Sequence, residues 1–351
     1  MKRIFNSFKP FIYLIFLVYF ISCQKNGFKS EEFLKTRIDS SKYSSISNDS
    51  LLRIKLKLKE NIYNQLLKED SIRNKFKTSF IEKNDTSECG TYYTPEDFLK
   101  EFPLSFLCSN EIPEVENKKI LVFQVVAHAI NDGLNESDFK IALENVNKNF
   151  KSARIQFELV TNLKLDPRYS DFITSRDEKE LTGAYEMDKK IHIFIVNSIL
   201  KGNEILDGYT YMSDEVNFIF INAGALNTKN TFSHEMGHFF SLLHTHGPSE
   251  STLEFVNETN CSCDGDMVCD TPADPNLYKY SLNNCIYKGD ARDQHNELYK
   301  PDPSNIMSYG FDCRNTFTEG QFKRMRWAAL KRKVNFINKF LDTPSSDILQ
   351  Q

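Results

Sequence analysis

The stretch from residue 234 to residue 244 constrains the fold more than any other part of the chain. It begins with the letters HEMGH, and His244 follows six residues after His238. If the first part is helical, His234 and His238 lie one turn apart and project from the same face. Two imidazoles placed in this way can bind one Zn²⁺ ion at about 2.0–2.1 Å each. Glu235, beside the first ligand, is then positioned to take a proton from a metal-bound water.

His244 adds a requirement on the backbone. Six residues at about 100° each would carry it to another face of a continuous helix, so it can join the site only if the helix ends soon after His238 and the chain turns back. The alternative is three unrelated histidines on a buried helix. With 7 His among 351 residues, this pattern arises by chance roughly once in several thousand such chains. We therefore interpret the stretch as the metal site of a zinc-dependent hydrolase.

Four segments carry a family resemblance. Residues 231–244 resemble the zinc-binding consensus of the metzincin metalloproteases, and Asn305–Tyr309 looks like the methionine turn of those enzymes. Together with residues 265–272 and 317–325, they are similar to the pappalysin (cytophagalysin) family. The four segments occur in the family's order, and the resemblance covers roughly residues 115–343. One departure is Ser241, which stands where metzincins usually carry a glycine that lets the helix end with positive φ.

The resemblance implies an α+β fold, preceded by a helical prosegment. The metzincin-like catalytic domain would contain a twisted mixed sheet, an active-site helix, and a loop-rich lower half with a C-terminal helix. His234, His238 and His244 would hold zinc, and Glu235 would be the general base for hydrolysis of protein or peptide substrates. Met307 would lie beneath the metal without binding it.

Tyr309, two residues after Met307, would hydrogen-bond the tetrahedral intermediate; the alternative is a buried tyrosine with no catalytic part. Two other functions stay open. A protease of another clan would use Glu254 or Glu258 as its third ligand in place of His244, and a surface-binding lipoprotein could carry the same fold without catalysis. His246 could also compete with His244, although it stands two residues outside the family's spacing.

An acidic segment lies between the histidines and the methionine turn. Asp264, Asp266, Asp270 and Thr271 place four oxygen donors within eight residues. Hard oxygen ligands on a loop suit Ca²⁺, although the spacing is not that of an EF-hand. The resemblance implies a structural calcium near this segment, and a solvated acidic loop is the alternative.

The N-terminus predicts export. Lys2 and Arg3 precede an apolar run from Phe11 to Ile21, as in a secretory signal sequence, and the run is short for a transmembrane helix. Ser22-Cys23 resembles a bacterial lipoprotein cleavage box, which predicts a signal peptide over 1–22 and a membrane anchor on Cys23; plain secretion is the alternative. Either way we expect an extracytoplasmic protein. The net charge of −4, with both signs interspersed, does not favour nucleic-acid binding.

The rest of the chain divides into four expected parts. Residues 23–50 are polar and read as a flexible tether. Residues 51–114 form the expected prosegment, with helical spacing of apolar residues up to Lys83. The catalytic domain then spans 115–343, and 344–351 form a tail. Within the domain we expect strands at 119–129, 155–160, 191–196 and 217–221, a helix over 139–150 capped by Ser137, and a last helix over 319–341 that begins with a capping box at Thr318 and Gln321.

The cysteines suggest disulfides and one special thiol. The chain has 8 Cys, and setting Cys23 aside leaves an odd number for an oxidising compartment. Cys89, in Cys89-Gly90-Thr91, resembles the family's cysteine switch, in which a thiolate occupies the open position of zinc; a disulfide with Cys108 is the alternative. The resemblance implies a Cys285–Cys313 disulfide. Cys269 would pair with Cys261 or Cys263, and the sequence does not fix which.

Overall fold

The computed structural model describes Cys89 and residues 117–130, 136–185, 188–248 and 253–342. These residues all belong to one compact unit of the chain, Leu67–Gln351. The expected signal peptide, tether and tail lie outside the described residues, as does the expected helical prosegment apart from Cys89. Among the residues that are described, no helix has the length and apolar character needed to cross a membrane.

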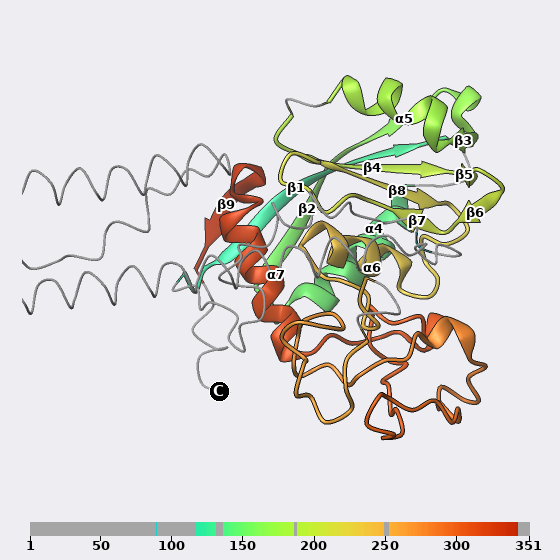
Figure 1. The fold of residues 1–351 in the computed structure, drawn as a ribbon. Helices are drawn as coiled ribbons and strands as arrows, with labels where there is room; N and C mark the ends of the chain where they lie inside the picture. Colours follow the sequence, from blue (N-terminus) through green and yellow to red (C-terminus); the bar gives the residue numbers. More distant parts are fainter. Residues whose placement is uncertain (1–88, 90–116, 131–135, 186–187, 249–252, 343–351) are drawn as a thin grey trace, which may run out of the picture. The chain divides into compact units, whose positions relative to one another are not determined.

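A six-stranded mixed sheet forms one layer (Figure 1). Its strands are β1 (Ile120–Ala129), β2 (Ile155–Lys164), β4 (Ile191–Val196), β7 (Gly208–Tyr209), β8 (Phe218–Asn222) and β9 (Ile337–Leu341). The order is β2-β1-β4-β8-β7, with β9 beside β1. The β1, β2, β4 and β8 pairings are parallel, while β7 and β9 pair antiparallel to their neighbours. All four strands expected from the sequence are present, and β7 forms an edge of the sheet.

Both faces of the central strands β1, β4 and β8 are buried, which explains their continuous apolar sequences. In β4, Ile191, Ile193 and Ile195 pack into the core that contains the long helices. Phe194 and Val196 point to the opposite face and join a second core. There the Phe194 ring stacks on Phe220 with centroids 4.8 Å apart. Successive side chains of a strand point to opposite faces, so the same strands serve both cores.

Three helices cover one face of the sheet and share its core. They are α4 (Glu136–Phe150), α6 (Thr231–Phe239) and α7 (Glu319–Lys331). Helix α4 begins at Glu136, so Ser137 lies inside its first turn and not at the expected capping position. A small sheet of β3 (Asp171–Ile173), β5 (Ser198–Lys201) and β6 (Glu204–Leu206), with α5 (Thr174–Gly183), was not expected. Its strands are too short to give a clear apolar period.

The prediction of one helix over 319–341 is wrong in its second half. The capping box at Thr318 and Gln321 is confirmed, but α7 ends at Lys331. The buried ammonium of Lys333 donates to the carbonyls of Ser213 and Val216, which holds the chain after the helix. Residues 337–341 then pair with the first half of β1. Apolar residues such as Ile337 gain more from this pairing than from extending the helix.

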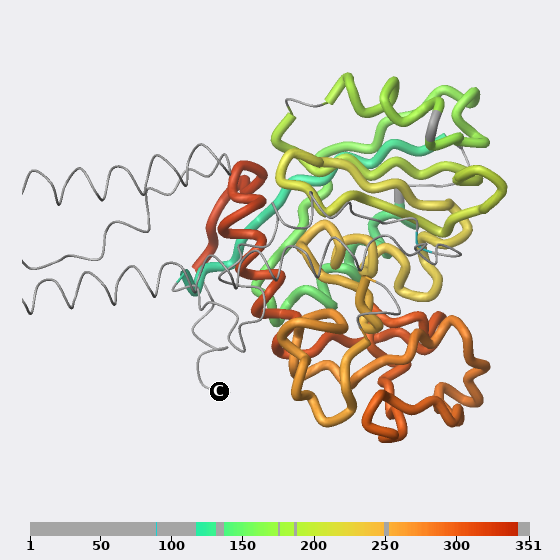
Figure 2. The backbone as a smooth tube through the Cα atoms, in the orientation of Figure 1, coloured from blue at the N-terminus to red at the C-terminus, as the bar shows by residue number. Residues whose placement is uncertain are grey.

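The lower half of the domain consists mainly of loops (Figure 2, orange). Short 3-10 turns lie at Leu277–Lys279 and Phe311–Cys313. Disulfides join Cys261 to Cys269 and Cys285 to Cys313, and Cys263 is disulfide-bonded as well. Cross-links of this kind compensate for the small number of long helices and strands, because they restrict the unfolded chain.

Candidate metal centre

Helix α6 carries the first two histidines and stops directly after them. Every residue of α6, from Thr231 to Phe239, is buried. The amide of Ser241 donates to the His238 carbonyl at 2.9 Å, and the amide of Leu242 donates to the Gly237 carbonyl at 3.0 Å. These two bonds form a Schellman motif. The chain therefore turns back after the helix, as the participation of His244 requires.

Ser241 takes the left-handed conformation that this motif needs, with φ 69°. Glycine usually fills such a position because a side chain raises the energy of this conformation. Ser241 is buried, and its hydroxyl accepts a hydrogen bond from the guanidinium of Arg332. Serine thus fits at the position where the family usually has glycine, and His244 still reaches the other two histidines.

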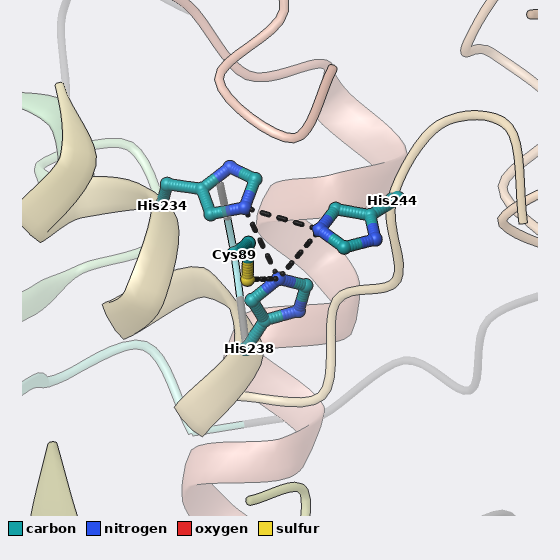
Figure 3. Close-up of side chains that lie close together, drawn as sticks. All are labelled: Cys89, His234, His238 and His244. Atoms are coloured by element: carbon teal, nitrogen blue, oxygen red, sulfur yellow. Dashed lines mark hydrogen bonds between the residues drawn. The ribbon is translucent and has the colours of Figure 1, made fainter. Parts of the chain in front are cut away.

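The three histidines point their Nε2 atoms at one another (Figure 3). The Nε2 of His234 lies 3.2 Å from the Nε2 of His238 and 3.2 Å from that of His244, and the third pair is 3.1 Å apart. Tetrahedral ligands at about 2.0–2.1 Å from a zinc ion would lie roughly 3.3 Å from one another. The three nitrogens therefore have the spacing that such an ion requires.

Hydrogen bonds on the other ring nitrogens fix the tautomer. The Nδ1 of His234 donates to the carbonyl of Ile306 at 2.7 Å, and the Nδ1 of His238 donates to the carbonyl of Leu242 at 2.8 Å. The Nε2 lone pairs are then directed into the centre, an arrangement typical of metal-binding histidines. Burial lowers the pKa of His238 to about 4, and burial holds the pKa of His244 well below its usual value. The rings are therefore neutral and able to bind a cation at pH 7.

Cys89 lies at the same centre. Its Sγ is 3.4 Å from the Nε2 of His238, and its side chain is buried without forming a disulfide. The four ligand atoms of Cys89 and the three histidines lie within 4.8 Å of one another. The backbone of Cys89 also forms a parallel bridge to Gly208 on the edge strand β7. The expected Cys89–Cys108 disulfide, the alternative to a switch, is therefore not formed.

Met307 packs beneath α6 and is fully buried. A Cβ atom added to Gly237 would lie 2.5 Å from the Met307 sulfur, so the glycine makes room for the methionine. The carbonyl of Met307 accepts from the amide of Thr245 at 3.1 Å, which joins this turn to the residue after His244.

Tyr309 and His246 lie against His244. The Tyr309 ring is buried, with its centroid 4.7 Å from that of His244. The His246 ring stacks on His244 with centroids 5.2 Å apart and an angle of 10°. His246 does not belong to the group of converging ligand atoms. It packs against one of them.

Glu235 is buried beneath the edge strand. A Cβ atom on Gly208 would lie 2.9 Å from the Glu235 Cγ and 3.1 Å from its Oε1. Gly208 therefore gives room to the Glu235 side chain, a role that sequence reasoning missed. The dipeptide Gly208-Tyr209 gave no strand signal of its own, and only its pairing with β8 reveals it as an edge.

Arg314 is a second residue that the sequence did not single out. It is buried, its Nη1 lies 3.2 Å from the Nδ1 of His234, and its Nε donates to the carbonyl of Lys229 at 2.7 Å. Burial, and next the positive charge of Arg314, hold the pKa of His234 well below its usual value. In the sequence, only the position of Arg314 directly after Cys313 hinted that it lies near the site.

The acidic segment divides into two environments. Asp266 is buried and accepts from the Thr271 hydroxyl at 2.7 Å. Asp270 is turned toward the start of α7, where it accepts from the Thr318 hydroxyl and the Gly320 amide at 2.7 Å each. Asp264 accepts from the side chain of Asn260 at 2.9 Å. The four expected oxygen ligands therefore do not converge as one set.

Glu254 lies with this segment and not with the histidines. It is 1% exposed, and neither of its carboxylate oxygens has a hydrogen-bond partner. Burial raises the pKa of Glu254 to about 9, and Asp266 contributes next through its charge. Among the described residues, the converging group at α6 contains no glutamate, so the structure places neither Glu254 nor Glu258 as a third ligand.

Comparison with known proteins agrees with this geometry. The family model Peptidase_M43, described as pregnancy-associated plasma protein-A, matches residues 177–330, a span that contains all three histidines. Over this span the chain is similar to the pappalysin family, and this match together with the curated relatives supports a metalloprotease. A pappalysin-family metalloprotease depends on a metal ion and acts on protein or peptide substrates.

Curated relatives of this protein are fungal proteins named extracellular metalloprotease. The one from Arthroderma benhamiae is 25% identical over 69% of this chain and 91% of its own length. The one from Verticillium alfalfae is 35% identical over 37% of this chain and 41% of its own length. The disulfides of the lower half fit an extracellular protein. A solved chain titled "Structure of a chaperone-substrate complex" is 13% identical, at a TM-score of 0.35, over 62% of this chain and 39% of that one.

Proposed function

We propose that this protein is a zinc endopeptidase in which His234, His238 and His244 hold the metal and Glu235 is the general base. The observation that carries the proposal is the convergence of three Nε2 atoms at 3.1–3.2 Å from one another. Three neutral imidazoles, with no carboxylate in the group, favour zinc over calcium or magnesium. When bound, zinc would polarise the scissile carbonyl and make water a better nucleophile at neutral pH.

The chain's own residues would move the proton and position the substrate. Glu235 takes a proton from the attacking water and passes it to the leaving amine. Tyr309, whose ring contacts His244, would donate a hydrogen bond to the oxyanion of the tetrahedral intermediate. Once Cys89 leaves its bridge to Gly208, the edge strand β7 would accept an extended peptide as an added strand, as edge strands do in other peptide complexes.

The substitution Glu235→Ala tests this assignment, in protein that also carries Cys89→Ser so that the thiol cannot occupy the metal centre. Hydrolysis of a denatured protein such as gelatin should fall at least about 10²-fold, because the general base is lost, while the zinc content of the purified protein stays the same. Glu144→Ala, at an exposed position on α4, is the matched control and should be fully active. Unchanged hydrolysis by the Glu235→Ala protein would rule out the mechanism. Unchanged zinc with no hydrolysis in either protein would favour a non-catalytic binding role.

The third ligand is tested separately. His244→Ala should remove zinc and activity together, while His246→Ala should retain zinc because its ring only stacks on His244. A His244→Ala protein that keeps its metal, with Glu254→Ala losing it, would move the protein to the clan that uses a glutamate ligand.

We propose further that the protein is made as a latent zymogen, with residues 51–114 as the prosegment and Cys89 as its switch. Thiolate is a strong zinc ligand and would exclude the catalytic water. The 3.4 Å contact of Cys89 with His238 and its bridge to Gly208 support this proposal. Cys89 would thereby occupy both the metal and the strand edge that a substrate needs.

A structural calcium ion is our proposal for the acidic segment. Glu254 supports it, because a buried carboxylate with two unpartnered oxygens is unstable unless a cation or proton neutralises it. The negative charges of Asp266, Glu258 and Asp264 also raise the pKa of Glu254, so these carboxylates lie near it. The proposed ligands are thus Glu254, Asp264 and Asp266. Asp270 is not among them, because its carboxylate accepts hydrogen bonds at the start of α7.

The site of action is proposed from the N-terminal motif. Export by residues 1–22 and lipidation of Cys23 would place the enzyme on the outer side of a bacterial membrane. Labelling of cells with a palmitate analogue should mark the protein, and Cys23→Ser should abolish the label. A protein that remains unlabelled and is released to the medium would instead be plainly secreted.

A further inference from the structure

Three aromatic side chains form a continuous surface beside the metal centre, which we call the aromatic wall. It consists of Tyr278, Tyr309 and Phe311. The Tyr278 centroid lies 6.0 Å from that of Tyr309 and 6.3 Å from that of Phe311, and Tyr309 and Phe311 are 6.3 Å apart. Tyr309 is buried, but Tyr278 is 41% exposed, so one end of the wall remains open to a ligand.

The wall touches the side chain that lies at the metal centre. Cys89 forms an apolar cluster with Leu277 and Tyr309, and Tyr287 and Phe311 pack against that cluster. At its other end, the Tyr309 ring is 4.7 Å from the ring of His244. A peptide that replaced Cys89 at the metal would therefore place the side chain next to its scissile bond against the same aromatic surface.

Phe311 has a strained backbone conformation. Its φ is 51°, a conformation rare for a bulky residue. The neighbouring residues constrain it, because Cys313 is joined to Cys285 and the amide of Cys313 donates to the carbonyl of Gly310 at 3.0 Å. The ring is thus fixed toward Tyr309 before any substrate arrives.

The ammonium nearest the Phe311 ring is already paired with a carboxylate. The ammonium of Lys229 lies 5.7 Å from the centroid of the Phe311 ring, but it is also 3.4 Å from a carboxylate oxygen of Asp207. A charged substrate side chain at this ring would lose hydration and would compete with Asp207 for Lys229. An aromatic side chain would bury a large apolar area and stack on Tyr278 and Phe311.

We propose that the aromatic wall is the specificity surface of the enzyme and selects substrates with an aromatic or large apolar side chain next to the scissile bond. This inference rests on the proposed endopeptidase function. It assigns to Tyr278 and Phe311 a role in binding and none in the chemistry.

Cleavage-site mapping in a peptide library tests the proposal, using full-length protein that carries Cys89→Ser. Aromatic and large apolar residues should be enriched at one position flanking the cleaved bonds. Phe311→Gly then removes the ring while suiting φ 51°. It should lower kcat/KM for a Phe-containing peptide about 10- to 200-fold relative to its Gly-containing analogue. Phe311→Tyr should restore the preference, and Phe340→Ala, an exposed aromatic on β9, should leave it unchanged.

The outcomes separate the two proposals. Cleavage with no enrichment, or with enrichment of charged residues, would overturn the specificity proposal and leave the endopeptidase standing, as would an unchanged Phe-to-Gly ratio in the Phe311→Gly protein. No cleavage by zinc-loaded Cys89→Ser protein, even after proteolytic removal of the residues before Lys119, would overturn both.

Discussion

At the scale of single residues, the region around α6 depends on positions where a side chain is missing or constrained. Gly237 admits the Met307 sulfur beneath the helix, and Gly208 admits Glu235 beneath the edge strand. Ser241 carries the left-handed turn that ordinarily uses glycine. Each position fixes where a neighbouring functional residue lies without supplying a metal-ligand atom of its own.

Gly208→Ala should therefore impair catalysis without removing the metal. The added methyl group would lie 2.9 Å from Glu235 Cγ and 3.1 Å from the carbonyl oxygen of Phe220, so Glu235 or β7 must shift. A displacement of about 1 Å can cost roughly 10²-fold in rate. In a Cys89→Ser background, we expect kcat/KM for peptide hydrolysis to fall by about 10- to 100-fold, with zinc content unchanged.

Gly183→Ala is the matched control, because a Cβ atom there meets nothing within 4 Å. It should retain full activity. Equal activities of the two variants would mean that Glu235 is not held by the approach of Gly208.

Some of these residues could be predicted from the sequence and others could not, for physical reasons. His234, His238 and Glu235 could be named because ligand spacing along a helix is a local property. His244 required in addition that the helix end, and Met307 was named from the family resemblance. Gly208 and Arg314 could not, since their contacts with Glu235 and His234 join segments distant in the chain. Glu254 was considered only as a zinc ligand, and its burial beside Asp266 is a tertiary property that spacing does not encode.

At the scale of elements, the strands of the main sheet were predictable and the chain after α7 was not. Continuous apolar runs such as 191–196 identify buried strands, whereas Ile337–Leu341 could continue a helix or form a strand by periodicity alone. Two elements also carry the proposed switch and the proposed calcium site. The edge strand β7 bridges to Cys89, and the loop from Glu254 to Asp266 gathers buried acids.

Cys89→Ser should release activity without proteolytic processing. Serine is a far weaker zinc ligand than thiolate, so it should no longer exclude water or substrate from the centre. The measurement is hydrolysis of a quenched peptide by the intact chain, whose length is verified by mass spectrometry. Wild-type protein in parallel should remain latent. A Cys89→Ser protein as silent as wild type would show that the thiol does not control latency.

The acidic loop should make stability depend on pH and calcium together. Burial raises the pKa of Glu254 to about 9 and that of Asp266 to about 7. Both values lie above those of unfolded carboxyls, so the stability from these groups is fully present below about pH 4 and is lost as pH rises toward 9. Calcium favours the charged forms. We therefore expect it to raise the Tm strongly at pH 8 and little at pH 5.

Glu254→Gln distinguishes this explanation from a general salt effect. The neutral amide should raise the Tm at pH 8 without calcium and should remove most of the response to calcium. Magnesium serves as the control ion. A calcium response that is the same in Glu254→Gln and in wild type would place the cation elsewhere.

At the scale of the whole described domain, the two halves are stabilised differently. The upper half rests on a sheet buried on both faces, while the lower half is cross-linked by Cys261–Cys269 and Cys285–Cys313. The Cys285–Cys313 loop spans 28 residues and encloses Met307 and Tyr309. The segment beneath the metal therefore depends on a covalent bond.

Reduction should loosen this half first. Loss of a disulfide across a loop of this length costs about 3–4 kcal/mol, which corresponds to a decrease in Tm of about 6–16 °C for a domain of this size. Thermal unfolding with and without reductant, in a Cys89→Ser background, measures the effect, and zinc should be lost in the same transition. Identical melting curves would show that the lower half holds itself together by packing alone.

The place of β9 has a consequence for maturation. The last strand lies beside Ile120–Phe123 of the first, on the flank that β4 covers only from Val125 onward. All six strands of the main sheet and helices α4, α6 and α7 thus come from residues 120–341. In the proposed maturation, a cut between Cys89 and Lys119 would withdraw none of the strands that the structure describes, so the domain over 120–341 would keep its sheet.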